Sequence, residues 1–354
     1  MRNRSSGGGG RVWYGTLTCE WPKCSNKSYW EMPTLKGASN ATTTIGKQYL
    51  CGVHSRRHKS IRKPLPRDPD AKMKREIELT LHQRTVEECA ADNERAGRRG
   101  RITVRKMRMM RAPALKSGTL NVFPNNRHGK RKDGYGAPEL SPMRLGPVNH
   151  KQPGLPPALN IENYHQFNKV FPNEVDEKTN DPLPVFYTRQ RAAYLDPVPH
   201  RHKFPLSEMK KLGKGKNANV PLYSVHKDEN TGHERRYTYV ESRQFYCKQY
   251  ELLAKKTEQF RHLKQRIEKG MNVCIWGYDG YPIEESADAI YRAYIDASRP
   301  FGHELVLFTL LVLSGSGNGI NAYPWRVFAN TTEASMRAQM ANLFSAQPSS
   351  SSSQ

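Results

Sequence analysis

The spacing of three cysteines and one histidine near the start of the chain constrains its fold more than any other feature. Two pairs of potential metal ligands, Cys19-x4-Cys24 and Cys51-x2-His54, are separated by 26 residues. A tetrahedral Zn²⁺ site takes two such pairs, each held by a tight turn. We therefore expect one zinc ion bound by Cys19, Cys24, Cys51 and His54.

Two further observations refine the zinc prediction. His58 is an alternative fourth ligand, but Gly52 favours His54, because glycine accommodates a tight turn between Cys51 and the histidine. Four protein ligands leave no open coordination position, so a structural site is expected rather than a catalytic one. The polar segment between the two pairs can bury little core, and a bound metal would supply the folding energy that it lacks.

The charge of the chain is the second constraint. The formal net charge is +24, and no acidic residue occurs from Arg95 to Lys132. Solvated surfaces usually mix both signs, so this excess indicates a polyanionic partner, with nucleic acid favoured over a membrane surface and DNA over RNA. We expect phosphate contacts from two basic stretches, which consist of Arg56, Arg57, Lys59, Arg62, Lys63, Arg98, Arg99, Arg101, Arg105, Lys106, Arg108 and Arg111.

Composition predicts an α+β protein built of several parts. Hydrophobic residues make up 36% of the chain, which also has 24 prolines and 26 glycines, so we expect a modest core and much irregular chain. The expected parts are a low-complexity tail (1–10), a small zinc-stabilised module (11–68), a helix and basic arm (69–112), a long Pro-rich irregular region (113–241), a small α/β domain (242–346) and a serine-rich tail (347–354).

Hydrophobic periodicity predicts the positions of the regular elements. Met73, Ile77 and Leu81 recur every four residues, followed by Val86 and Ala90, which predicts a helix over 70–96. In the last third we expect one helix over 242–270, a strand over 272–276, helices over about 284–297 and 301–313, and a final helix after a capping box of Asn330 and Glu333.

One group of charged residues near predicted strand and helix ends is a candidate active site. It consists of Asp279, Asp296, Arg299, His303 and Glu304. Such junctions bind ligands in α/β proteins, but turn formation, helix pairing and capping account for these residues equally well. No P-loop, nucleophile-elbow, H-E-x-x-H or G-x-G-x-x-G motif occurs. We therefore assign no catalytic residue and expect a non-enzymatic protein.

No segment has the pattern of a signal peptide or a membrane span. The longest apolar run, Leu305–Leu313, is too short to cross a bilayer. We therefore expect the protein not to be secreted and its thiols to be reduced, which suits zinc binding better than disulfide formation.

Six short phrases spread over residues 12–326 are distinctive. They are Tyr49–Ser55, Leu120–Pro124, Leu140–Pro147, Asn160–Gln166, Asp296–Leu305 and Tyr323–Trp325. Together they resemble uncharacterised basic, zinc-finger-like proteins of nucleocytoplasmic large (giant) DNA viruses. The resemblance implies a viral setting, in the cytoplasm or nucleus of an infected cell or inside the virion. It implies no catalytic residue.

Two functional hypotheses follow from the sequence. The first is a zinc-dependent, non-enzymatic nucleic-acid-binding protein whose basic arm contacts phosphates with little base specificity. In that case Trp13, Tyr14, Trp21 and Trp30 are candidates for stacking on bases, although packing around the metal explains them equally well. The second is a structural virion protein, of the capsid or core, whose basic, Pro-rich chain packs against other virion proteins or the packaged genome.

Overall fold

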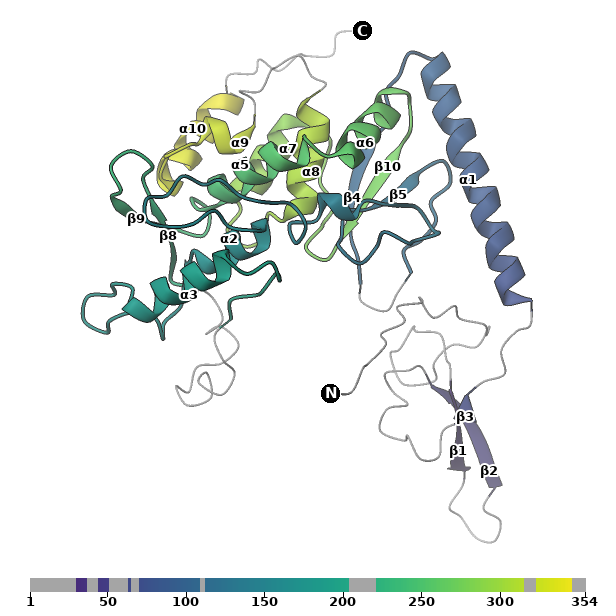
Figure 1. Ribbon diagram of the computed structural model, residues 1–354. Coiled ribbons are helices and arrows are strands. Elements are labelled where there is room, and N and C mark those ends of the chain that lie inside the picture. Colours follow the sequence, from purple (N-terminus) through teal and green to yellow (C-terminus); the bar gives the residue numbers. More distant parts are fainter. Residues whose placement is uncertain are drawn as a thin grey trace. The chain divides into compact units, whose positions relative to one another are not determined.

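The computed structural model describes the backbone of residues 30–36, 44–50, 63–64, 70–108, 112–203, 221–314 and 323–345, and the side chains of those from 70 to 342. The chain divides into two compact units, Met1–His82 and Gln83–Gln354. The elements (Figure 1) are β1 (Trp30–Lys36), β2 (Thr44–Leu50), β3 (Lys63–Pro64), α1 (Ala71–Arg95), β4 (Ile102–Lys106), β5 (Leu120–Phe123), β6 (Tyr135–Gly136), the 3₁₀ helix η2 (Pro138–Leu140), α2 (Ile161–Phe167), β7 (Lys169–Val170), α3 (Pro184–Tyr194), β8 (Tyr223–Lys227), β9 (Glu234–Tyr237), α5 (Arg243–Ala254), α6 (Glu258–Glu268), β10 (Val273–Gly277), α7 (Ala287–Ile295), α8 (His303–Leu313), α9 (Pro324–Val327) and α10 (Glu333–Ser345).

A small antiparallel sheet belongs to the first unit. Its strand order is β2-β1-β3, and the register pairs Trp30 with Leu50 and Lys36 with Thr44. The sequence positions of the two predicted zinc-ligand pairs flank this hairpin. All four predicted ligands, Cys19, Cys24, Cys51 and His54, lie outside the described residues.

The long helix α1 confirms the prediction for residues 70–96, but only part of its apolar stripe is buried. Val86 and Ala90 are buried, whereas Met73, Ile77 and Leu81 are all more than half exposed. The helix ends before Gly97, which has a φ of +63°. A glycine adopts this left-handed conformation without strain and so allows the chain to turn sharply into the next segment.

A four-stranded parallel sheet is the centre of the second unit. Its order is β4-β10-β5-β6, so β10 lies between two strands that precede it by about half the chain. Val273 of β10 pairs with Ile102 on one side and with Leu120 on the other. Because the strands are parallel, their first residues meet at one edge of the sheet, the amino edge, and their last residues at the opposite, carboxyl edge. Helix α8, buried from Glu304 to Leu313, contacts β4 and β10 (Figure 1).

The Pro-rich middle differs from the irregular chain that the sequence predicts. Between 113 and 241 the structure has strands β5 and β6 of the central sheet, helices α2 and α3, and a second sheet of order β7-β8-β9. Prolines separate these short elements rather than preventing them, and Pro184 opens α3, where its missing N–H costs nothing. The mixed helix and strand content confirms the α+β class.

Most predicted elements of the last third are confirmed, with two corrections. The expected helix over 242–270 is two helices, because Thr257 caps the start of α6 by accepting a 3.1 Å hydrogen bond from the Phe260 N–H. The cap of α10 is Thr332, whose Oγ1 accepts from the Ser335 N–H at 3.3 Å, whereas Asn330 has a φ of +57°. Among the described helices, none is long and apolar enough to span a membrane.

Candidate nucleic-acid interface

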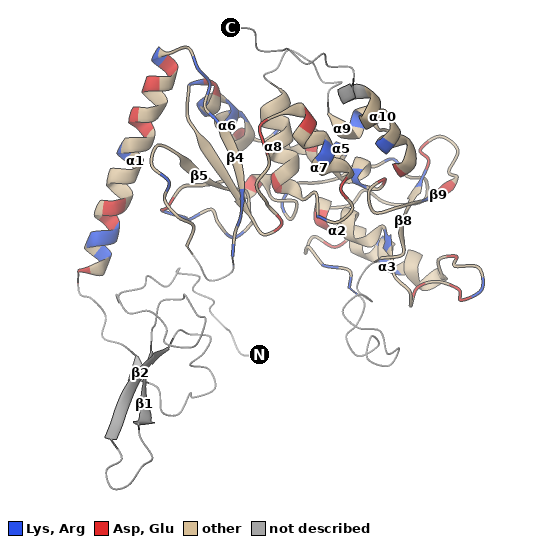
Figure 2. Cartoon of the chain, turned by 180° about the vertical axis from the view of Figure 1, so that it is seen from behind, with Lys and Arg blue, Asp and Glu red and all other residues tan. Residues whose placement is uncertain are grey.

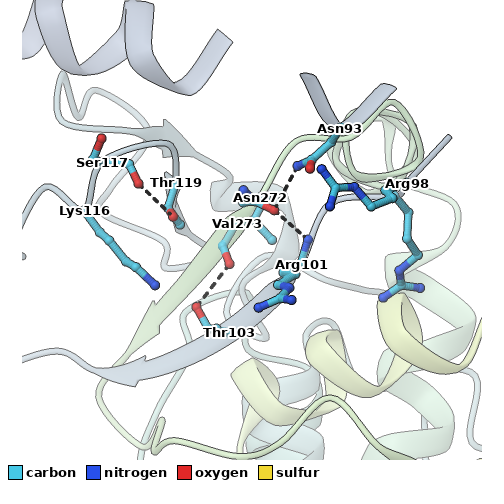
Figure 3. Close-up of a pocket in the computed structure, with 10 residues that line it drawn as sticks. Asn93, Arg98, Arg101, Thr103, Lys116, Ser117, Thr119, Asn272 and Val273 are labelled. Atoms are coloured by element: carbon cyan, nitrogen blue, oxygen red, sulfur yellow. Dashed lines mark hydrogen bonds between the residues drawn. The ribbon is translucent and has the colours of Figure 1, made fainter. Parts of the chain in front are cut away.

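A pocket of about 410 Å³ opens at the amino edge of the parallel sheet, where β4, β5 and β10 begin. We call it the basic pocket. In Figure 3, Lys116 lies on one side of it and Arg98 and Arg101 on the other, with Thr103 and Val273 between them. Its lining residues are Asn93, Arg98, Arg99, Arg101, Thr103, Lys116, Ser117, Thr119, Asn272 and Val273.

The side chain of Asn272 fixes the floor of the basic pocket. Its Oδ1 accepts hydrogen bonds from the Arg101 N–H at 2.9 Å and from Asn93 Nδ2 at 3.4 Å. Its Nδ2 donates to the Gly118 carbonyl and to Cys89 Sγ, both at 3.2 Å. One amide therefore joins α1, the start of β4 and the loop before β5, so the segments that carry the cations are held at fixed positions.

The arginines of the pocket belong to the short segment that connects the end of α1 at Arg95 with the start of β4 at Ile102. A side chain at Gly100 would place its Cβ 1.9 Å from the Met271 carbonyl oxygen, so only glycine permits this close approach. Arg98 and Arg99 directly precede this glycine and are exposed. Arg99 forms an ion pair with Glu285, whose other carboxylate oxygen accepts from the Ile102 N–H at 2.9 Å.

Three cations of the pocket have no acidic partner among the described residues. Arg98, Arg101 and Lys116 are exposed and take part in none of the ion pairs of the described chain. Two hydroxyls near them are turned toward the backbone: Thr103 Oγ1 lies 3.2 Å from the Val273 carbonyl, and Thr119 Oγ1 lies 3.5 Å from that of Ser117.

The chemistry of the lining suits an anion. None of its ten residues is Asp, Glu, His or Cys, so the pocket offers positive charge and hydroxyl groups without any negative charge. Arg and Lys side chains with hydroxyl donors are the groups that contact phosphate oxygens in nucleic-acid complexes. The basic pocket therefore suits a phosphate group.

The structure gathers only some of the predicted phosphate ligands. Arg98, Arg99 and Arg101 line the pocket, and Figure 2 shows Lys and Arg at the end of α1 and in the segment that continues into β4. The exposed side chains of Arg105, Lys106 and Arg108 lie outside the lining. The backbone of Lys63 is in β3, while Arg56, Arg57, Lys59, Arg62 and Arg111 lie outside the described residues.

Sequence reasoning missed several residues of the pocket. Lys116 belongs to the same acid-free stretch as the arginines, and that stretch is the signal that could have added it to the predicted ligands. Asn272 carries no such signal, because its role depends on β10 pairing between β4 and β5.

Part of the candidate active site lies at the carboxyl edge of the sheet. His303 Nε2 lies 3.0 Å from the Pro124 carbonyl oxygen, and His303 Nδ1 lies 3.3 Å from Glu304 Oε2. A Cβ on Gly302 would be 2.8 Å from that same oxygen and 3.2 Å from Asp279 Cβ, so these three side chains are neighbours. Glu304 is 1% exposed, and its Oε2 makes no hydrogen bond within the described structure.

Two further charged groups adjoin this edge. Burial lowers the pKa of Lys169 to about 8, and the nearby carboxylates of Glu162 and Asp279 oppose that shift. Burial likewise raises the pKa of Glu162, against the favourable charges of Lys169 and Arg201. We call Glu162, Lys169, Asp279, His303 and Glu304 the carboxyl-edge cluster. Within this cluster Glu162 and Glu304 are buried, Lys169 and His303 are partly buried, and Asp279 is exposed.

The other two candidates are engaged elsewhere, at the end of α7. Asp296 accepts hydrogen bonds from the Ser298 Oγ at 2.6 Å and N–H at 2.9 Å, and these bonds lower its pKa. Arg243 donates to the carbonyls of Asp296 and Arg299, at 2.9 and 2.6 Å, and so caps this helix end. The five predicted residues therefore do not form one site.

No group of three or more His, Cys, Asp or Glu side chains within the described part of the chain is arranged to hold a metal ion. Comparisons with protein-family models, with curated proteins and with solved structures found no match to this chain.

Proposed function

We propose that this protein binds nucleic acid through its phosphates, and that the basic pocket is a principal contact. The observation that carries the proposal is the convergence of Arg98, Arg101 and Lys116, none paired with an acidic group in the described structure, on one pocket. Three like charges held near each other repel, so the arrangement costs stability unless an anion occupies the space between them. A polyanion also accounts for the net charge of +24.

Phosphate contacts predict a particular dependence on salt. Each neutralised phosphate releases condensed counterions, so the logarithm of the binding constant falls by about 0.9 per contact for duplex DNA, and about 0.7 for single strands, per tenfold rise in salt. Contacts of this kind give affinity with little dependence on base sequence.

A salt series with a matched pair of variants tests the proposal. Fluorescence anisotropy with labelled DNA and RNA would compare the wild type with Arg98→Ala/Arg101→Ala/Lys116→Ala and with Lys248→Ala/Lys256→Ala/Arg261→Ala. The second variant removes three exposed cations, in α5, in α6 and in the turn between them, that do not line the pocket. We expect the salt slope to fall by about two for the pocket variant and to change little for the control. A flat salt response in the wild type, or equal slopes in all three proteins, contradicts the proposal.

The zinc module is part of the same proposal. Cys19, Cys24, Cys51 and His54 supply the spacing of a structural zinc site. The hairpin register supports it, because pairing Trp30 with Leu50 makes the chain enter and leave the hairpin at the same end, next to the two ligand pairs in the sequence. We expect about one equivalent of zinc in purified protein, and its loss in Cys51→Ser. Metal-free protein that retains the β1–β2 hairpin in amide exchange would overturn this assignment.

The giant-virus setting is proposed on the sequence resemblance alone. Mass spectrometry of purified virus particles tests it, and also tests the alternative of a structural virion protein. Many copies per particle favour a structural or genome-binding role inside the virion. Absence from particles excludes any role inside the virion.

A further inference from the structure

Beyond the basic pocket, one face of the parallel sheet carries further polar and aromatic side chains. In β4, Ile102 and Val104 are buried in the core, so the alternate positions, Thr103 and Arg105, point to the opposite face. The register pairs Thr103 with Cys274 and Arg105 with Trp276. Neighbouring residues of paired strands point to the same side, so Trp276 shares this face with the pocket lining and with Arg105.

Asn121 holds the ring of Trp276 in a fixed orientation. Trp276 Nε1 donates a 2.8 Å hydrogen bond to Asn121 Oδ1, and Asn121 Nδ2 donates to the Ala114 and Asp133 carbonyls at 3.3 and 3.2 Å. The indole is partly exposed. Tyr278, two residues further along, is 41% exposed. A preorganised aromatic ring at a basic surface is the kind of platform on which an unpaired base stacks.

Two cations adjoin this face: Lys116 lines the pocket, and Arg105 pairs with Trp276 in the register of β4 and β10. Burial raises the pKa of the Cys274 thiol, and the Thr103 hydroxyl and the charges of Arg105 and Lys116 oppose the shift. Asn272 on the pocket floor and Trp276 are four strand positions apart, which is roughly 13 Å. A phosphate chain in the pocket therefore has further positive charge along the way to the indole.

We propose that this face binds a single-stranded nucleic acid, with a phosphate in the basic pocket and a base stacked on Trp276. The inference rests on the proposed function and deepens it by naming the form of the ligand. A duplex can offer its phosphates to the pocket, but its bases are already stacked on one another and do not reach the indole. Single strands therefore gain a contact that duplexes lack.

The first experiment changes only the ligand. The wild-type protein is titrated with three labelled DNAs of the same length: oligothymidylate, an oligomer of abasic sites, and a duplex. The abasic strand keeps the phosphates and lacks the bases. We expect it to bind about tenfold more weakly than oligothymidylate, since one stacked base contributes on the order of that factor. Equal affinities for oligothymidylate and the abasic strand overturn the inference and leave phosphate binding by the pocket intact.

The second experiment changes the ring. Trp276→Leu removes the aromatic platform, and Trp276→Phe keeps an aromatic ring but loses the bond to Asn121. We expect Trp276→Leu to bind oligothymidylate about as weakly as the wild type binds the abasic strand, with unchanged duplex affinity, and Trp276→Phe to lie nearer the wild type. Equal losses for single strand and duplex in folded Trp276→Leu overturn the inference. Absence of salt-dependent binding to all three DNAs by the wild type overturns the proposed function as well.

Discussion

At the amino edge of the parallel sheet, Arg98, Arg101 and Lys116 extend into an open pocket without acidic partners in the described structure. At the carboxyl edge of the same sheet, Glu304 and Glu162 are buried beside His303 and Lys169. Open α/β sheets usually bind ligands at the carboxyl ends of their strands. Here two carboxylates are buried at that edge, and the basic pocket lies at the opposite edge.

Charge alone therefore does not identify a site. The carboxyl-edge cluster holds the carboxylates of Glu162 and Glu304 inside the fold, so removal of the charged groups beside them should affect folding. The pocket holds charges that repel one another at the surface, so their removal should affect binding and leave folding intact. Four experiments test this contrast.

The largest expected effect is acid destabilisation of the interior beside the second sheet, where His226 of β8 is buried. His226 stacks on Phe245 at 3.6 Å, and burial, with a smaller contribution from the charge of His150, lowers its pKa to about 3. In the unfolded chain this histidine is protonated below about pH 6.5, whereas in the folded protein it stays neutral until the pH is much lower. Stability is therefore complete above that pH and falls as the pH drops toward 3, by about 1.4 kcal/mol per pH unit from this group, or roughly 3 kcal/mol by pH 4.5.

Urea unfolding at a series of pH values measures this slope. His226→Phe removes the titrating group and keeps a ring against Phe245, so we expect a shallower slope. His233→Gln, at an exposed position, is the control and should keep the wild-type slope. An unchanged slope in His226→Phe would show that other groups cause the acid sensitivity.

The second effect concerns the close packing of Glu304 against Gly277 at the carboxyl edge. A methyl group on Gly277 would lie 1.7 Å from Glu304 Oε1 and 2.0 Å from its Cγ, in a region with no free space. We expect Gly277→Ala to destabilise the protein by about 1–3 kcal/mol. Truncation of the opposing side chain relieves the clash, so Gly277→Ala/Glu304→Ala should lose less than the sum of the two single variants. Additive losses would show that the two residues do not meet.

The third effect tests the floor of the pocket. Asn272→Ala removes four hydrogen bonds that join α1, β4 and the loop before β5, and leaves the Arg101 N–H without its acceptor. We expect a loss of about 1–2 kcal/mol in the free energy of unfolding and weaker DNA binding. Asn230→Ala, in the exposed turn after β8, should change neither quantity. If Asn272→Ala reduced the stability but left DNA binding unchanged, Asn272 would have no part in positioning the cations of the pocket.

The smallest expected effect is on the stability of the pocket variant. Arg98→Ala/Arg101→Ala/Lys116→Ala removes no ion pair of the described structure, so the free energy of unfolding should change by less than about 0.5 kcal/mol per residue. At low salt the variant should even gain stability, because repulsion among the three charges is removed. If the variant instead lost as much free energy of unfolding as Gly277→Ala, these cations would stabilise the fold, and the two edges of the sheet would not differ in the way described.

Local signals in the sequence predicted helices well and connections between distant segments poorly. The apolar spacing located α1, α7 and α8 within a few residues. Helices α7 and α8 bury one face or the whole helix in the core, whereas α1 buries only Val86 and Ala90 of its predicted stripe. The break between α5 and α6 was missed, since the apolar stripe continues across the cap at Thr257. The short strands β5 and β6 lie among prolines and glycines and carry too few residues for a periodic pattern.

The candidate site was predictable in its charges and not in its shape. The acid-free stretch predicted Arg98, Arg99 and Arg101 as phosphate ligands, and all three line the basic pocket. The opposite wall and the floor come from Lys116 and Asn272, which the parallel pairing of β10 with two earlier strands brings beside them. Sequence spacing carries no information about such pairing when the partners are far apart in the chain.

The central position of β10 also has a consequence for the order in which the chain can fold. During synthesis β4 and β5 emerge long before Val273, yet they do not pair with each other, because β10 occupies the place between them. Until that last strand arrives, both carry unpaired backbone groups that invite pairing with other chains. We therefore expect the nascent chain to bind chaperones. Fragments that end before Val273 should aggregate under conditions in which the full-length protein does not.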